Sequence, residues 1–431
     1  MSPNLSHRVR RIGHLDLPGA GQVCVADGHA YVGHIPSPSQ LGTSIVDVSD
    51  PKNPRVAAAI TLDDPASHSH KARAVGDILI VNHERNMSRI GRRAEQLPAE
   101  RRILADTLKR EPTRAELAAR MNVTENDLRT LEEYEQRGYD NGGFKIYDVS
   151  RPSEPKLICY QKTGGIGSHR FDMDARYAYI STEMKGYVGN ILIIYDLHDP
   201  AKPQEISRWW MNGQHIAGGE TPTWPGKRHR LHHALRRGNE MWASCWHGGF
   251  YAIDVSDLSK PKTAGHYNYH PLFPEPTHTV MPVPQTIGGR RIALAIDEED
   301  QAQSASEEEA RRGRAHACIL TFDVSDLASI KPLGQFQVSE LDSPFSRTPG
   351  AHQYCEVMHG TLVHAVWFGG GLRILDVADP LSPREVGYFI PEPAGGRSAP
   401  QSNDVALDDR GLIYVVDRHV GFDILEYEGA A

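Results

Sequence analysis

Hydrophobic and polar positions follow one phrase that recurs along the chain. An apolar, β-branched run is closed by Asp and by a turn that contains Pro, as in IVDVSDPKNP and ILDVADPLSP. Such a run predicts a strand and its exit turn. A second short strand follows, for example KLICYQK at 156–162. The copies begin at Ile45, Ile146, Ile194, Ile253, Phe322, Ile374 and, in a shortened form, Asp423.

Seven copies spaced about 50 residues apart predict one repeated supersecondary unit. Each unit reads as strand A, a tight turn, strand B, a loop, strand C with the phrase, and strand D. The second unit shows this order in KARAV (71–75), the turn Gly76-Asp77, ILIVN (78–82), FKIYDV (144–149) and KLICYQ (156–161). Four-stranded units of this length fit a single seven-bladed β-propeller domain over 1–431.

The two ends of the chain complement each other in this arrangement. RVRRIGHLDL (8–17) has the pattern of a last strand without the three before it, and residues 404–429 supply three strands and stop. Pairing the two ends closes the ring and covers the strand edges. We expect the first complete blade to run from about residue 18 to 62.

The recurring phrase resembles the LVIVD repeat, a β-propeller repeat named for the apolar run before the Asp. The resemblance covers nearly the whole chain and implies an all-β, seven-bladed β-propeller. A propeller scaffold hosts many functions, so it implies no chemistry by itself.

Long loops gather on one predicted face, where strands D and A and strands B and C connect. The largest, 85–142, is helical by pattern, with apolar residues at helical spacing, and we expect residues 88–140 to act as a cap or lid on the active-site face. Its stretch 112–133 resembles the helix-turn-helix of sigma factors, although its charges are balanced, which favours a helical cap over DNA binding. Residues 304–315 are expected to form a solvated helix or a lid. The apolar residues at helical spacing within 85–142 are Leu104, Leu108, Leu117, Met121, Leu128 and Leu131.

Histidines recur at one register position. Counting back six residues from each A–B turn reaches the first residue of strand A, at the mouth of the channel on the long-loop face. One such residue alone is typical of a polar channel mouth, and a His there is also common in LVIVD-type repeats. Several converging neutral imidazoles favour a metal ion, because His is the commonest metal ligand. The predicted ligands of one divalent transition metal are His70, His169, His232, His278 and His352.

The ends of the B strands reach the same face and carry further polar residues. Metal-bound His usually donates its second N–H to a carboxylate, so glutamates here are natural partners of the histidines. Solvated rim charges are the alternative reading. The candidate catalytic residues are Glu84, Glu183, Glu298, His247 and His419.

The placement of the histidines is similar to that in two groups of propeller metalloenzymes. Carotenoid-cleavage-type oxygenases hold Fe(II) with four inner-strand His backed by Glu, and selenium-binding proteins, including methanethiol oxidases, use His-rich sites. The similarity implies an oxidase or oxygenase of a small organic substrate, with Fe or Cu favoured and Mn or Zn possible. A metal-dependent lyase or hydrolase, as in streptogramin-lyase propellers, and a non-catalytic scaffold for protein partners are the alternatives.

Composition narrows the partners and the compartment. The formal charge of −8 argues against nonspecific nucleic-acid binding, and no apolar run is long enough to span a membrane. The N-terminus lacks the apolar core of a secretory signal, and five scattered cysteines are typical of free thiols, so a cytoplasmic location is expected. We expect a small-molecule substrate and a possible homo-oligomer contact through the helical insertion.

Overall fold

The computed structural model describes residues 5–36, 39–86, 89–136, 138–299, 315–338 and 350–429. The expected helix or lid at 304–315 lies outside these ranges apart from Ala315.

Antiparallel pairing groups the strands into consecutive four-stranded meanders, in the order that the repeat predicts. The first contains β3 (Ala20–Ala26), β4 (His29–His34), β5 (Leu41–Asp47) and β6 (Arg55–Thr61). The next contains β8 (Ala72–Val75), β9 (Ile78–Arg85), β10 (Gly143–Asp148) and β11 (Lys156–Lys162), with β7 (Ser67–His68) added beside the end of β9. It is followed by β12 (Gly164–Met173), β13 (Tyr177–Glu183), β14 (Ile191–Asp196) and β15 (Gln204–Trp209).

The same order continues through the C-terminal half. β16 (His229–Arg237), β17 (Glu240–Trp246), β18 (Phe250–Asp254) and β19 (Lys262–Tyr267) follow a short 3-10 turn, η1 (Ile216–Gly218). Next come β20 (Thr277–Pro282), β21 (Ile292–Asp297), β22 (Ile319–Asp323) and β23 (Lys331–Phe336). β24 (Ala351–Tyr354), β25 (Leu362–Trp367), β26 (Gly371–Asp376) and β27 (Arg384–Phe389) form the next meander, with β1 (Ser6–His7) on β27.

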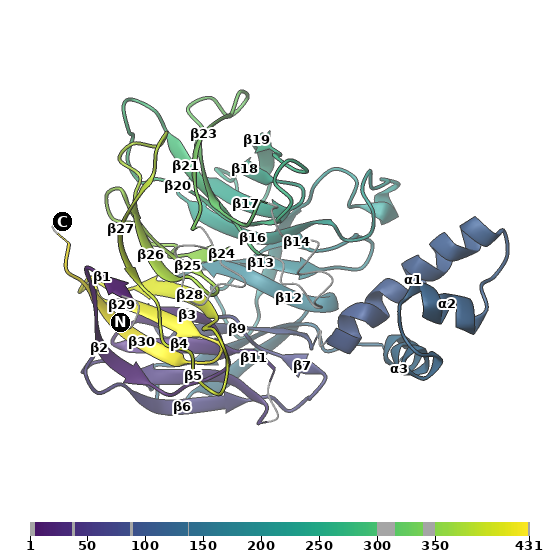
Figure 1. Cartoon of the computed structure of the whole chain (residues 1–431), viewed down its shortest axis with the longest axis horizontal. Coiled ribbons are helices and arrows are strands. Elements are labelled where there is room, and N and C mark those ends of the chain that lie inside the picture. Colours follow the sequence, from purple (N-terminus) through teal and green to yellow (C-terminus); the bar gives the residue numbers. More distant parts are fainter. Residues whose placement is uncertain are drawn as a thin grey trace.

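The N-terminal and C-terminal strands pair with each other, as predicted. β28 (Ser402–Leu407), β29 (Ile413–Asp417) and β30 (Gly421–Tyr427) are completed by β2 (Val9–Leu15), which pairs with β30 from Val9↔Tyr427 to Leu15↔Phe422. β28 also packs on β3, and one apolar cluster joins Val23 and Val46 to Tyr414 and Ile424. The first and last meanders are therefore neighbours, and the sheets curl into a ring (Figure 1).

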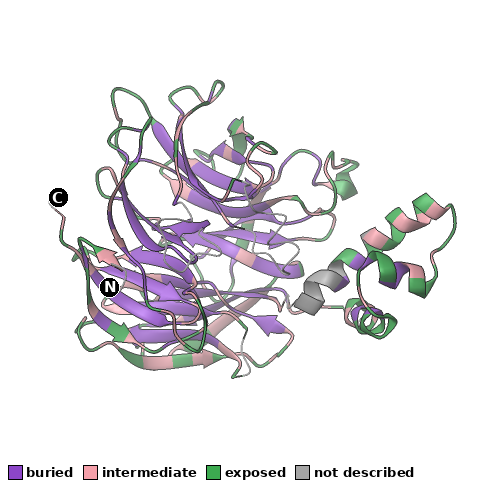
Figure 2. Cartoon of the chain, in the orientation of Figure 1, coloured by how far each residue is buried: buried purple, intermediate pink, exposed green. Residues whose placement is uncertain are grey.

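The core lies between neighbouring sheets. Trp367 of β25 belongs to the same apolar cluster as Leu294 and Ile296 of β21, and comparable clusters lie between other neighbouring sheets. The first three strands of each meander are mostly buried, whereas the last, such as β6 or β11, is largely exposed or half-buried (Figure 2). The prediction of an all-β propeller is confirmed.

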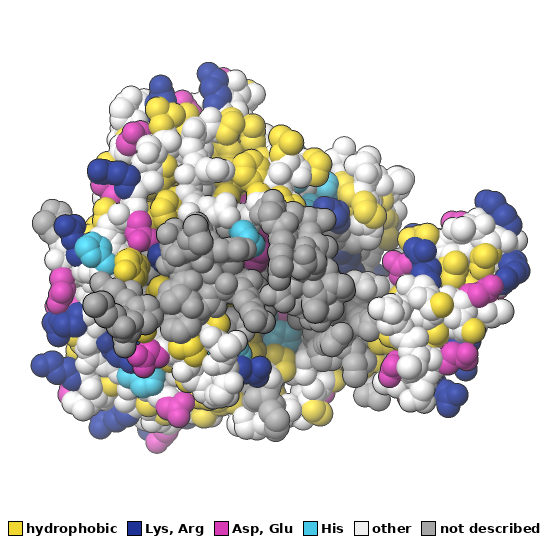
Figure 3. All heavy atoms as spheres, viewed as in Figure 1, with side chains coloured by type: hydrophobic (Ala, Val, Ile, Leu, Met, Phe, Trp, Pro, Cys, Tyr) yellow, Lys and Arg dark blue, Asp and Glu magenta, His cyan; other side chains and the backbone are white. Residues whose placement is uncertain are grey.

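The insertion in the β9–β10 loop forms three helices, α1 (Arg89–Leu108), α2 (Arg114–Arg120) and α3 (Glu125–Gln136). They project from the strand body and pack around their own small core, which includes Leu117, Leu128 and Leu131 (Figure 1). A capping box between Thr113 and Glu116 begins α2. Acidic and basic side chains are intermixed over these helices (Figure 3). No described helix is both long enough and apolar enough to cross a membrane.

Candidate metal centre

The first strands of successive meanders bring the predicted histidines together. His169, His232, His278 and His352 lie on β12, β16, β20 and β24, and His70 lies two residues before β8. Their rings follow one another in an arc, with centroid separations of 5.1, 4.9, 4.0 and 4.5 Å from His70 to His352. All five histidines selected from the sequence therefore belong to one cluster.

Three of these rings have the Nδ1 atom held by a hydrogen-bond acceptor. His232 Nδ1 lies 2.6 Å from the carbonyl oxygen of His278, and His278 Nδ1 lies 2.9 Å from Oε1 of Gln353. His352 Nδ1 contacts the carbonyl oxygen of Asn403. An acceptor at Nδ1 keeps the proton of a neutral ring on that nitrogen, which leaves the Nε2 lone pair for a ligand. Partners of this kind orient histidines at metal sites.

His169 is oriented in the same way by a carboxylate. The oxygens of Glu84 lie 2.9 and 3.1 Å from its Nδ1, and its Nε2 faces Nε2 of His232 at 3.1 Å. Burial would raise the pKa of Glu84, but its interaction with His169, including the hydrogen bond, lowers it, so the acid is a carboxylate. When both rings are neutral, two lone pairs point into the same space, and they repel unless a cation or a proton lies between them.

A further histidine joins this end of the cluster. His68 Nε2 lies 3.5 Å from Glu84 Oε2, and His70 Nδ1 lies 3.9 Å from the same oxygen. The ligand atoms of these three residues all lie within 4.8 Å of one another. Strand β7 pairs His68 with Glu84 across the end of β9, which places it there. Sequence reasoning missed His68, although alternate residues of an extended chain share a face, and the SHSH stretch carried that signal.

The other end of the cluster is built around Glu298. Its carboxylate lies 3.8 Å from His278 Nε2 and 3.7 Å from His352 Nε2. His232, His278 and Glu298 form the second group whose ligand atoms lie within 4.8 Å of one another. Imidazole and carboxylate donors suit Fe, Cu, Zn and Mn, so both groups fit the predicted transition metal.

Burial holds the imidazoles in the form that binds metal. Removal from solvent lowers the pKa of His68 to about 4. Neutral imidazole is the metal-binding species, so these rings need not lose a proton near neutral pH before they bind an ion. The same loss of solvation lowers the pKa well below the ordinary value in four further rings, those of His70, His232, His278 and His352.

The remaining predicted catalytic residues lie apart from these groups. Glu183 pairs with Lys227, whose Nζ is 2.5 Å from its carboxylate, rather than with His169. His247 Nε2 lies 3.1 Å from a backbone carbonyl oxygen, and His419 lies two residues beyond β29. In the described part of the chain, neither metal-sized group includes any of the three.

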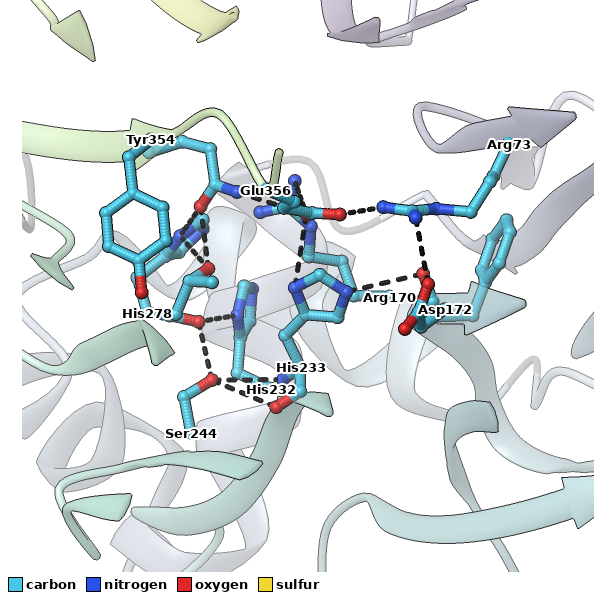
Figure 4. A network of polar contacts seen from close by, with 12 residues as sticks. Arg73, Arg170, Asp172, His232, His233, Ser244, His278, Tyr354 and Glu356 are labelled. Atoms are coloured by element: carbon cyan, nitrogen blue, oxygen red, sulfur yellow. Dashed lines mark hydrogen bonds and ion pairs between the residues drawn. The ribbon is translucent and has the colours of Figure 1, made fainter. Parts of the chain in front are cut away.

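A buried polar network supports the histidines from the next positions of the same strands. Arg170 lies 3.4 Å from Asp404 and 3.6 Å from Glu356, and His233 Nδ1 lies 3.4 Å from Glu356 (Figure 4). Arg73 joins Glu356 to Asp172 and lines a cavity of about 580 Å³. These ion pairs cross between strands that are distant in the sequence, and so they fix the strands that carry the histidines.

Comparisons with known proteins agree with the repeat and the fold. Residues 242–269, from β17 to β19, match the family model of the LVIVD repeat. The C-terminal WD40 domain of Sif2 is similar over 98% of this chain and 99% of that chain, with a TM-score of 0.54 and 8% identity. Sqt1 of Saccharomyces cerevisiae is similar over 96% of this chain and 86% of that chain, with a TM-score of 0.50 and 8% identity. No curated protein matches the sequence. The chain therefore carries an LVIVD repeat within a β-propeller fold.

Proposed function

We propose that this chain is a metal-dependent enzyme that acts on a small organic substrate beside the histidine cluster. The observation that carries the proposal is the 3.1 Å separation of the Nε2 atoms of His169 and His232, with an acceptor at each Nδ1. Metal–imidazole bonds are about 2.0–2.1 Å long, so two nitrogens at angles of about 90–109° around one ion lie about 2.8–3.4 Å apart. The observed separation is in this range.

A proton shared between the two rings would also bring them together, but it would not account for the rest of the cluster. His68, His70 and His278 converge with Glu84 and Glu298 in two groups of ligand size. Buried polar groups without a partner are costly. The large number of imidazole nitrogens that face one space therefore favours an ion that binds several of them at once.

In this proposal the residues of the cluster have different roles: some bind the ion, one orients a ligand, and one can accept a proton. His169, His232 and their neighbours in the arc supply nitrogen ligands, and Glu84 orients His169 through Nδ1. Glu298 lies between His278 and His352, where it can bind the ion or accept a proton from a substrate. A bound ion would supply Lewis acidity, and with Fe or Cu also redox chemistry with dioxygen.

We favour an Fe- or Cu-dependent oxidase or oxygenase, because neutral imidazoles outnumber carboxylates in the cluster. A metal-dependent lyase or hydrolase on the same residues is the runner-up. An oxidase consumes oxygen and stops under anaerobic conditions, whereas a lyase or hydrolase continues with Mn²⁺ or Zn²⁺. We further propose that the ring has seven blades, one for each copy of the repeat phrase.

The proposal is tested by calorimetric titration of the metal-free full chain with Fe²⁺ under anaerobic conditions, and separately with Cu²⁺, Zn²⁺ and Mn²⁺. We expect saturation near one ion per chain for at least one of them. Exchange of His232 for Ala should abolish saturable binding, whereas exchange of the exposed His198 for Ala should leave it unchanged. Equal binding by both variants, or no saturable binding by the unaltered chain, would leave the scaffold as the better account.

A further inference from the structure

The ring of His169 stands between the two groups of metal-ligating residues. Its Nδ1 faces the carboxylate of Glu84 at 2.9 Å, and its Nε2 faces Nε2 of His232 at 3.1 Å. An ion bound at Nε2 would therefore lie on the far side of the ring from Glu84. Metal–ligand bonds of about 2.0–2.2 Å do not reach across an imidazole ring, so one ion cannot bind both His169 Nε2 and Glu84.

The two groups share no residue and have the same composition. The first consists of His68, His70 and Glu84, and the second of His232, His278 and Glu298. Two imidazoles and one carboxylate are a complete set of protein ligands for Fe²⁺ or Zn²⁺, with positions left for water or a substrate. Each group therefore contains the ligands for an ion of its own.

The separations around Glu84 fit an ion better than they fit hydrogen bonds. Its Oε2 lies 3.5 Å from His68 Nε2 and 3.9 Å from His70 Nδ1, and the amide nitrogen of Asn82 is 3.5 Å from both Oε2 and His70 Nδ1. Hydrogen bonds from nitrogen are usually about 2.7–3.2 Å long. Two ligand atoms at about 109° around one ion lie about 3.3–3.6 Å apart. The first separation is in this range, and a shift of a few tenths of an ångström brings the second into it.

The backbone holds this group in place before an ion binds. His68 and His70 are alternate residues of an extended segment, so their side chains share a face. β7 pairs His68 with Glu84 at the end of β9, and the backbone nitrogen of Lys71 donates a hydrogen bond of 2.9 Å to Oδ1 of Asn82, also on β9. The segment is thus attached to β9 on both sides of the two histidines.

We infer that His68, His70 and Glu84 bind a second divalent transition-metal ion, in addition to the ion at His169 and His232. This inference rests on the proposed function, which includes only the first ion. A carboxylate has about four acceptor positions, so Glu84 can bind the second ion and still accept a hydrogen bond from His169 Nδ1. Glu84 then links the two ions through the ring of His169.

The second ion is the more weakly bound of the two. Its group contains two imidazoles, whereas the first ion can be bound by several histidines of the arc. The positive charge of Lys71 also acts on His70 and opposes a cation there. We expect an affinity about a hundredfold lower than that of the first ion. A chain purified without added metal, or titrated only as far as the first ion requires, then contains one ion.

The test is equilibrium dialysis of the metal-free full chain against rising concentrations of free Zn²⁺, with the bound metal measured by elemental mass spectrometry. We expect a first plateau near one ion per chain and a second near two, at about a hundredfold higher Zn²⁺. His68→Ala should keep the first plateau and lose the second. His70→Ala, which leaves the pairing of β7 intact, should act in the same way, and the exposed His198→Ala should keep both plateaus.

Each other outcome is decisive. A single plateau for the unaltered chain, or a second plateau that both His68→Ala and His70→Ala retain, would overturn the inference and leave the first ion standing. Loss of the first plateau in His68→Ala, with the fold retained by circular dichroism, would also overturn it, because both groups would then bind one common ion. No plateau for the unaltered chain would overturn the proposed function, and the inference with it.

Discussion

The Nε2 atoms of His169 and His232 face each other at 3.1 Å, although the two residues are 63 positions apart in the sequence. The Nδ1 atom of each ring has a hydrogen-bond acceptor, which is the carboxylate of Glu84 for His169 and the carbonyl oxygen of His278 for His232. Both rings are thus oriented before any ion binds. A site of this kind binds metal without large rearrangement, because the ordering cost is met by folding.

Exchange of Glu84 for Gln should weaken metal binding about 10–100-fold without unfolding the chain. The amide can still accept from His169 Nδ1, but it has lost the negative charge that stabilises the metal-bound ring. Glu183→Gln is the matched control, because Glu183 pairs with Lys227 instead of a cluster histidine. Calorimetric metal titrations of both variants provide the comparison. A larger loss with Glu183→Gln would show that the roles of the two glutamates are reversed.

Acid should destabilise the metal-free protein between pH 6.5 and 4, the range over which burial lowers the pKa of His68. In this range the unfolded chain protonates this residue and the folded chain does not, so the free energy of unfolding falls as pH falls. His68 contributes up to about 1.4 kcal/mol per pH unit, and His68→Gln should reduce the slope by that amount. Urea unfolding at several pH values measures it. An unchanged slope, like that expected for the exposed His198→Gln, would show that His68 is not buried in the neutral form.

Removal of residues 1–15 should destabilise the ring at its closure. The truncation deletes β2, and with it β1 from the edge of β27. It also takes Arg11 and His14 from Asp423, a buried acid that they approach at 2.9 and 2.7 Å. Loss of the partners of a buried charge costs about 3–5 kcal/mol. Thermal melting and light scattering should show a lower midpoint and association through the exposed edge of β30. Arg10→Gln, which breaks only exposed pairs, should cost less than about 1 kcal/mol. A truncated chain that stays monomeric and melts like the full chain would refute this closure.

Replacement of residues 88–137 by a short Gly-rich linker should leave the strand body folded. The helices have their own core, and the strands on either side, β9 and β10, pair with each other directly, as in His83↔Gly143. The replacement keeps Tyr139 and Asn141, which contact Ser67 and His83. Circular dichroism should show lost helix with retained strand signal, and metal affinity should stay the same. Turnover should fall if the helices act as a cap, whereas loss of the strand signal would make them part of the ring.

Much of the fold can be predicted from the sequence because its determinants are local. An apolar run, an Asp and a Pro-containing turn recur within a few residues, and these features place the third strand of each meander except the last, where the phrase is shortened. The histidines could be found because their positions are fixed by a short count from a tight turn. The helical insertion was visible from the spacing of residues such as Leu117 and Leu128, which are now buried in its core.

The partners of these histidines could not be predicted in the same way. His68 lies in the site because β7 pairs with the end of β9. Glu183 lies outside both groups, and its carboxylate forms an ion pair with Lys227, which lies in a long loop. Such contacts depend on loop conformations and on pairings between distant segments, which carry no fixed spacing in the sequence.

The most direct test of the metal site is the metal content of the full chain, purified without a polyhistidine tag and analysed by elemental mass spectrometry. The unaltered protein and His198→Ala should each contain close to one transition-metal ion per chain. His169→Ala should lose most of it while its melting and circular dichroism stay close to those of the unaltered protein, since removal of one ligand leaves the blade cores intact. Equal metal content in His169→Ala and the unaltered protein, or no stoichiometric metal in any of the three, would contradict the account.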